Sequence, residues 1–283
     1  MKTILSSILI ISLLFTNLIL SQDFKGKATY KSQRKMNIEM DSTHMNDEMQ
    51  KQMMAMLKKQ FEKEFTLDFN NEESLYKEAI NLDKPTGASS GGMEIIVAGN
   101  GAGDLLYKNL KEDRYANQSD LFGKIFLIQD DLEQPEWTLE KETKNIGQYT
   151  CFKATYKRMV KETGMMKMSV NSKEDAEEPE VKEVAQTVTA WYTIQIPVKH
   201  GPGNYSGLPG LILEVSDGSE TILCSKVIIN PKDGIAIEEP KKGKKVSQKE
   251  FETVMEKKMK EMDEQFNSNR RDGGDNIEIR IQG

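Results

Sequence analysis

The sequence predicts a mainly β protein of the α+β class, a curved antiparallel sheet or half-barrel that carries two amphipathic helices. Three observations support this fold class. Many short segments alternate apolar and polar residues, which is the period of a half-buried strand. Turn residues separate these segments, and two methionine-rich segments instead repeat apolar residues every three or four positions.

The best specified stretch runs from Trp191 to Val215. The segment before its turn alternates from Val184 to Ile196, and an apolar segment follows from Gly210 to Ser216. Prolines and glycines fill the connection, where proline fixes φ and glycine permits positive φ. The stretch therefore predicts two strands joined by a shaped turn.

The other predicted strands show the same alternation or short apolar runs. A long strand with one wet face is predicted at Phe24–Met40. The remaining strands are predicted at Phe61–Phe69, Ser74–Ile80, Asp104–Leu110, Lys124–Asp130, Trp137–Glu142, Tyr149–Val160, Thr221–Ile229 and Gly234–Glu238.

Two segments have helical spacing. The first is an inserted helix at about residues 42–60, with methionines on one face. The second begins at the capping box Ser247-Gln248-Lys249-Glu250 and ends near Asn269. The final residues, IEIRIQG, alternate as an edge strand does, or form a disordered tail.

Two loops interrupt the sheet, a Gly-rich loop at residues 85–104 and an acidic loop at residues 171–183. The first contains GNGAG without the Lys-Ser/Thr of a phosphate loop, so it does not indicate nucleotide binding. The expected organisation is a signal peptide at residues 1–21, a β domain at residues 22–240, and a helix and tail at residues 241–283.

Residues 1–21 have the pattern of a secretory signal peptide: Lys2, an apolar run and a small residue before Gln22. Its interior polar residues and short core favour cleavage over a membrane anchor. We expect a periplasmic or extracellular protein with no transmembrane segment after cleavage. The formal net charge of −6 excludes nucleic acid as a default partner.

The two cysteines, Cys151 and Cys224, lie in alternating apolar segments of a chain destined for an oxidising compartment. A disulfide between neighbouring strands and two unpaired buried thiols are both consistent with this pattern. The spacing of their Cα atoms, which decides between them, is not encoded in the sequence.

Catalytic patterns are weak. The chain has two histidines, His44 and His200, and neither belongs to a recognisable metal or triad motif. No catalytic residue is assigned and no cofactor is expected, so a non-enzymatic protein is the main hypothesis. An uncharacterised hydrolase using His200 is an alternative.

A second alternative is a soft-metal site in the inserted helix, where His44, Met45 and Met49 are close in sequence. Thioether sulfurs and one imidazole suit Cu(I). Methionines at helical spacing more often form a packing or partner-binding face. The second helix repeats the methionines without a histidine, which favours packing.

The hexapeptide Gly207-Leu208-Pro209-Gly210-Leu211-Ile212 gives the sequence a resemblance to a known family. With Trp137, the run from Thr143 to Cys151 and Ala190-Trp191-Tyr192-Thr193, it resembles the GLPGLI family of secreted proteins of unknown function from Gram-negative bacteria. The resemblance implies secretion and a single β domain. It transfers no activity and no residue role.

The resulting hypothesis is a cell-envelope protein that binds a hydrophobic small ligand, or that binds or scaffolds an outer-membrane transporter or another envelope protein. Candidate binding residues lie in and before the central turn, where a shaped loop carries aromatic and polar groups. They are Trp191, Tyr192, His200, Tyr205, Leu208 and Pro209.

Overall fold

The computed structural model describes residues 24–34, 37–40, 62–79, 104–163, 181–269 and 279–282. Twelve strands form one sheet in the order β13-β7-β6-β5-β4-β3-β1-β12-β11-β10-β9-β8. Neighbours are antiparallel except β13 and β7, which are parallel. A separate two-stranded sheet pairs β14 with β2.

The strands are numbered in chain order. They are β1 (Gly26–Arg34), β2 (Asn37–Met40), β3 (Lys63–Phe69), β4 (Glu73–Glu78), β5 (Leu105–Asn109), β6 (Arg114–Leu121), β7 (Lys124–Asp131), β8 (Thr138–Ile146), β9 (Tyr149–Thr163), β10 (Val181–Thr193), β11 (Leu211–Ser216), β12 (Glu220–Ile229), β13 (Lys244–Val246) and β14 (Ile279–Gln282). The helix α3 spans Gln248–Asn269.

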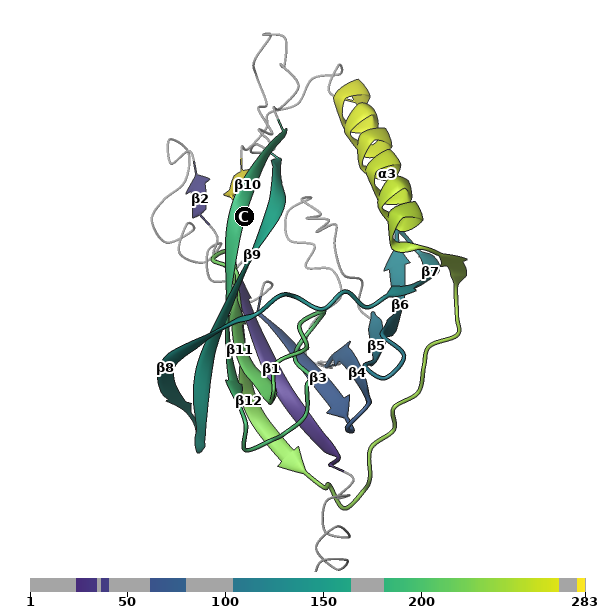
Figure 1. The fold of residues 1–283 in the computed structure, drawn as a ribbon. Coiled ribbons are helices and arrows are strands. Elements are labelled where there is room, and N and C mark those ends of the chain that lie inside the picture. The colour runs from purple at the N-terminus through teal and green to yellow at the C-terminus, as the bar shows by residue number, and fades with distance from the viewer. Residues whose placement is uncertain are drawn as a thin grey trace, which may run out of the picture.

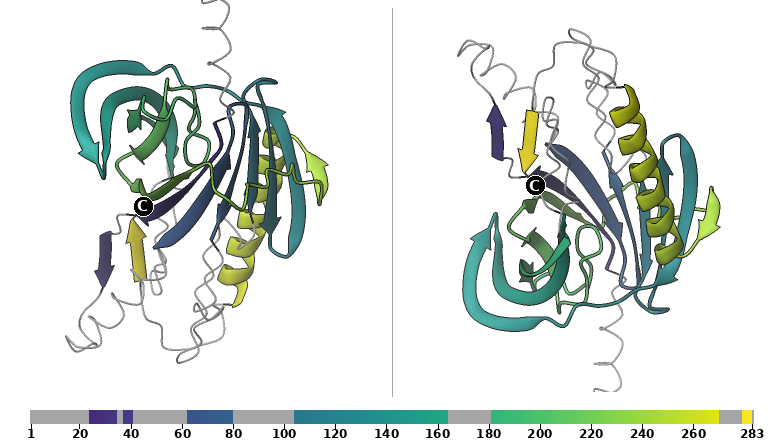
Figure 2. Two further views of the ribbon diagram at one scale, coloured as in Figure 1. Left: turned by 90° about the horizontal axis from the view of Figure 1, so that it is seen from below. Right: turned by 90° about the horizontal axis from the view of Figure 1, so that it is seen from above.

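The sheet curls most strongly at its β8–β10 end, around the segment that follows β10 (Figure 2). The main core fills this curl, with side chains from β1, β3, β9, β10, β11 and β12 and from the segment between β10 and β11. Smaller clusters lie under β4–β7 and beneath the start of α3. The most curved end of the sheet therefore holds most of the buried apolar surface.

The helix α3 begins as its sequence predicts. The backbone N–H of Ser247 donates to the Glu250 carboxylate at 2.8 Å, and the N–H of Glu250 donates to Ser247 Oγ at 3.3 Å, which completes the capping box. Phe251 packs against Phe126 of β7, with ring centroids 5.5 Å apart. No helix among the described residues combines the length and the apolar character needed to span a bilayer.

The expected antiparallel half-barrel with two helices is wrong. The sheet is open because β8 and β13 are its two ends, and it is mixed because β13 returns parallel to β7. Among the described residues α3 is the one helix, and the inserted helix expected at residues 42–60 lies outside them. β13 could not be predicted from the sequence, because it has only three residues and follows a long irregular connection.

Most predicted strands are present, with three differences besides β13. The single strand expected at Phe24–Met40 is two strands, β1 in the large sheet and β2 in the small one. Strand β6 was not predicted, because its buried residues Ala116 and Ser119 are small or polar. The strand expected at Gly234–Glu238 is irregular chain instead, held by Ile237, which packs on the β4–β7 cluster, and by an ion pair between Glu239 and Arg114 at 2.7 Å.

The hairpin of β9 and β10 is longer than its neighbours. β8 pairs with β9 only as far as Thr155, and β11 pairs with β10 only from Thr189 onward. Residues 156–163 of β9 and 181–188 of β10 therefore pair with each other alone among the described strands. We call these two segments the ribbon, and Figure 1 shows β9 and β10 reaching beyond β8 and β11.

Candidate functional site

Most of the candidate binding residues lie in the core. Tyr192, His200 and Leu208 are buried in the described structure, and Tyr205 is half-buried. Pro209 is the exposed member of the set. The structure thus brings most of the predicted residues together, but they pack in the core inside the curl.

Trp191 lies on the opposite face of β10 from Tyr192. The Lys144 ammonium sits over its indole ring, 4.4 Å from the centroid, and pairs with Glu214 at 2.6 Å. Glu214 is in turn the cross-strand neighbour of Trp191 on β11. The indole ring on this face of β10 therefore has a lysine as its cation–π partner.

The segment of residues 194–210, here called the inner segment, is held by main-chain hydrogen bonds. The N–H of Gly207 donates to the Lys199 carbonyl at 2.9 Å, and the N–H of Ile212 donates to the His200 carbonyl at 3.1 Å. Gly210 lies so close to β10 that an added Cβ would stand 2.1 Å from the Thr193 carbonyl oxygen. Only glycine fits there.

A fully buried lysine organises the middle of the inner segment. Lys108 of β5 donates from Nζ to the carbonyl oxygens of Gly201, Gly203 and Tyr205, at 3.0, 2.6 and 3.1 Å. An ammonium has three N–H donors, so all of them are used. Burial lowers the pKa of Lys108 to about 7.

His200 is equally buried and stays neutral. Burial, and next the charge of Lys108, lowers the pKa of His200 to about 3. Neither ring nitrogen makes a hydrogen bond of normal geometry within the described structure, although the backbone of Asn70 lies near the ring. A hydrolytic base needs an accessible nitrogen and an orienting partner, and His200 has neither here.

The remaining predicted site residues are the two cysteines and the proposed copper ligands. Cys151 and Cys224 are free, buried thiols, and burial raises their pKa values to about 11 and about 12. Such thiols are poor nucleophiles and poor metal ligands at neutral pH. The proposed copper ligands His44, Met45 and Met49 lie outside the described residues.

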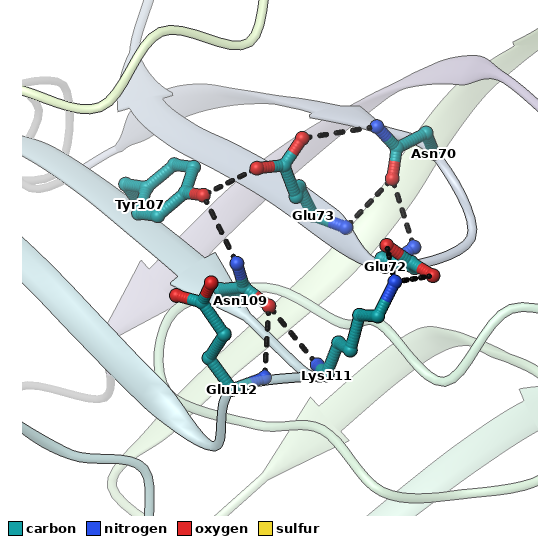
Figure 3. Close-up of polar contacts among 7 residues, drawn as sticks. All are labelled: Asn70, Glu72, Glu73, Tyr107, Asn109, Lys111 and Glu112. Atoms are coloured by element: carbon teal, nitrogen blue, oxygen red, sulfur yellow. Dashed lines mark hydrogen bonds and ion pairs between the residues drawn. The ribbon is translucent and has the colours of Figure 1, made fainter.

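A polar network fastens two turns at one end of the sheet (Figure 3). Asn70 accepts from the N–H groups of Glu72 and Glu73, and Asn109 accepts in the same way from Lys111 and Glu112. Tyr107 links the two turns: its hydroxyl donates to Glu73 at 2.5 Å and accepts from the Asn109 amide at 3.4 Å. Burial, and then this bond, raises the pKa of Tyr107 to about 12. The groups satisfy each other, so the network is structural.

An open hollow of about 550 Å³ lies where β8 separates from β9. Its walls combine three threonine hydroxyls, a tyrosine, a proline and two oppositely charged side chains. They are Pro135, Glu136, Thr138, Thr155, Tyr156, Lys157 and Thr187. None of these residues was singled out from the sequence.

The wall of the hollow is attached to the inner segment. Tyr156 packs edge-on against Trp137, with ring centroids 4.8 Å apart. The Trp137 indole N–H donates to the Ser206 carbonyl at 2.8 Å. The tyrosine is thereby fixed from behind by the segment that Lys108 holds.

A bulge interrupts β8 shortly after Thr138, which lines the hollow. The pairing of β8 with β9 shifts register between Leu139 and Thr143. Lys153 of β9 pairs with Glu140 at 3.1 Å and with Glu142 at 3.0 Å, and Thr155 donates to Glu140 at 2.8 Å. The bulge is therefore fixed in shape, and β8 pairs with β9 on both sides of it.

Hydroxyl side chains continue from the hollow across the outer face of the sheet. Strand registers place one hydroxyl residue on each of five neighbouring strands, in the order Thr138, Thr155, Thr189, Ser216 and Thr221. All are partly or fully exposed. The hollow and this row together offer hydrogen-bond donors and acceptors on a surface with little net charge.

Comparison with known proteins gives limited information. Residues 137–214 match the model of a family described as "Protein of unknown function (Porph_ging)", which covers most of the hollow, the ribbon and the inner segment. The match does not confirm the name GLPGLI. No curated protein matches the sequence at a significant level.

Two solved structures of PNGF-II, in space groups C2 and P21, are similar to this chain at a TM-score of 0.46 each. Sequence identities are 14% and 13%, over 81% and 82% of this chain but only 32% and 33% of the PNGF-II chain. The chain thus spans about one third of the length of these structures. A likeness of this strength carries no argument about activity.

Proposed function

We propose that the protein is secreted into the cell envelope and acts there as a binding protein, with the hollow as the place where its partner is held. The observation that carries the proposal is the composition of the hollow. Hydroxyls, a fixed aromatic ring and one charge of each sign converge there from β9, β10, the start of β8 and the residues before it. Few convergent polar groups around an aromatic wall are typical of binding sites.

The hollow favours a polar partner over the hydrophobic ligand considered from the sequence. The apolar side chains inside the curl pack against each other and against the inner segment. The exposed hollow instead offers threonine hydroxyls, Glu136 and Lys157. A protein partner in the envelope fits this surface better than an acyl chain does, because buried polar groups without hydrogen bonds cost free energy.

A hydrolase that uses His200 is not supported. The imidazole is buried and neutral, and it makes no hydrogen bond to a described carboxylate that could orient it. Its place in the inner segment, near Lys108, indicates a packing role.

Site-specific photocrosslinking in the producing cells tests the proposal. A photoreactive phenylalanine analogue at Thr187, which lines the hollow, should give a discrete adduct with an envelope protein. The same analogue at Lys226, an exposed position on β12, is the matched control and should give none. Equal adducts at both positions, or none at Thr187, would contradict a binding role for the hollow.

The same cells test secretion. N-terminal sequencing of protein recovered from the periplasm or the medium should begin next to Ser21 or Gln22. Protein found in the cytoplasmic fraction with an uncleaved N-terminus would contradict the proposed secretion into the envelope.

A further inference from the structure

The ribbon leaves one edge of β9 without a strand neighbour. Residues 156–163 face β10 on one side, and the side where β8 lies lower down has no strand beside it among the described residues. The register of β9 with β10 is regular through these residues. In an antiparallel ladder every second residue then points its N–H and C=O outward.

Such an edge is a template for another extended chain. The two terminal strands of the twelve-stranded sheet are poorer templates. β8 has the charged bulge at Glu140–Glu142, and β13 has three residues. Bulges and short lengths are the devices that prevent strand addition, and residues 156–163 have neither.

The opposite edge of the ribbon is braced at its base. The Arg158 side chain lies across β10, where it donates to the Gln186 amide oxygen at 2.8 Å and pairs with Asp217 at 3.0 Å. Asp217 belongs to the turn after β11, so this turn stands beside β10. The edge of β9, in contrast, opens directly onto the hollow through Tyr156 and Lys157.

The charge of the β9 edge indicates which kind of chain binds there. Residues 156–163, YKRMVKET, contain Lys157, Arg158 and Lys161 and one acid, Glu162, in a chain whose formal net charge is −6. Arg158 is already paired with Asp217, so the charge open to a partner beside the hollow is that of Lys157. Lys157 makes no ion pair within the described structure. Basic edges repel each other, which opposes pairing with a second copy, and they attract an acidic strand.

We infer that the partner contributes an extended, acidic segment that adds as a strand to residues 156–163 of β9, with side chains on one of its faces entering the hollow. This inference rests on the proposed function and names the partner's chemistry. Main-chain hydrogen bonds provide affinity, and Lys157 with the threonines of the hollow provides selectivity. The occupant is a polypeptide because only a polypeptide presents main-chain N–H and C=O groups at the strand spacing.

The test uses the full mature chain and three synthetic peptides long enough to span the edge. One alternates Thr and Glu, one alternates Thr and Lys, and one is the Thr–Glu peptide interrupted by proline, which cannot form a ladder. Amide hydrogen exchange followed by NMR reads each backbone position. The Thr–Glu peptide should slow exchange at alternate amides of residues 156–163, whereas the other two peptides should not.

Two matched variants sharpen the test. Lys157→Glu should weaken binding of the Thr–Glu peptide by about tenfold or more, because it replaces attraction by repulsion. Lys226→Glu makes the same charge change on β12 and should leave binding unchanged. Circular dichroism of both variants should match the wild type, since both lysines are exposed.

Three results would overturn the inference. They are no protection by the Thr–Glu peptide at millimolar concentration, equal protection by the Thr–Lys peptide, and protection that appears with protein concentration alone, which would make this edge an interface between two copies. If crosslinking from Thr187 succeeds while the peptide test fails, the hollow is still a binding site and strand addition is wrong.

Discussion

The inner segment and the ribbon follow each other in the chain and differ in almost every physical respect. In the inner segment, main-chain groups bond to each other, to Lys108 and to Trp137, and the apolar side chains fill the curl. Among the described strands the two segments of the ribbon pair only with each other, and the β9 edge faces the hollow. The segment richest in sequence motifs is thus a packed structural element, while the surface free to bind another molecule has no motif.

This difference predicts opposite responses to substitution. Changes in the inner segment should alter stability and affect binding only through folding. Changes in the ribbon and hollow should alter binding while the free energy of unfolding stays nearly constant.

The largest effect is expected for Gly210→Val. The new side chain would collide with the Thr193 backbone, which cannot move without breaking the turn out of β10. We expect a loss of about 5 kcal/mol or more in the free energy of unfolding, or no folded protein. Denaturant unfolding measures it.

Gly218→Ala is the control for Gly210→Val, because its added Cβ meets no atom within 4 Å and only its positive φ of 95° is strained. Its cost should be about 1 kcal/mol. Equal losses for the two variants would show that backbone strain, and not close packing against β10, decides the role of Gly210.

The second prediction concerns the free energy of unfolding at acidic pH. The pKa of His200 is about 3 in the folded protein and near 6.5 in the unfolded chain, so only the unfolded chain takes up this proton between these values. Stability should therefore fall as pH drops from 6.5 toward 3, by roughly 4 kcal/mol from this residue. Urea unfolding of the wild type and of His200→Leu across this range measures the difference. The same acid dependence in both proteins would contradict a buried, neutral His200.

A smaller loss is expected for Lys108→Met. Methionine fills a similar volume but leaves the carbonyls of Gly201, Gly203 and Tyr205 without a donor. The cost should be about 2 kcal/mol near pH 7, partly offset because a buried charge is removed. Wild-type stability should also rise between pH 7 and the unfolded lysine pKa near 10.5, since the unfolded chain binds the extra proton in that window. A wild-type pH profile that is parallel to that of Lys108→Met would contradict this assignment.

The smallest effect on stability is expected in the hollow. Lys157→Glu and Thr187→Val change exposed side chains that make no ion pair or side-chain hydrogen bond within the described residues. The free energy of unfolding should change by less than about 0.5 kcal/mol. Loss of the partner adduct without loss of stability would place the binding surface in the hollow. A large loss of stability would make the hollow a structural feature.

Much of the fold could be predicted from sequence, because alternation is a local signal. β1, β3, β4, β5, β7 and β9–β12 all lie in segments with a clear apolar period or run. β6 and β13 were missed for physical reasons: the buried residues of the first, Ala116 and Ser119, are small or polar, and the second is too short to have a period. The open, mixed topology depends on how distant strands meet, which local patterns do not encode.

The candidate site was harder to predict. The turn around His200 has the composition of a binding loop, but Lys108, from a strand almost a hundred residues earlier, draws it into the core. One signal for the ribbon was present. The strand predicted at Tyr149–Val160 is longer than the one predicted at Trp137–Glu142, so antiparallel neighbours of unequal length leave an unpaired end. The lone Lys108 in the apolar strand LLYKN was the corresponding signal for the buried cation.

Native-state amide hydrogen exchange of the free protein tests the contrast between the two regions most directly. The amides of Gly207 in the inner segment, and of Leu211 and Ile212 that bond to it from β11, should exchange only through global unfolding, because they bond within the core. Every second amide of residues 156–163 should exchange orders of magnitude faster through its open edge. Uniform strong protection along these residues, equal to that of the inner segment, would show that the β9 edge is already covered and would contradict the account.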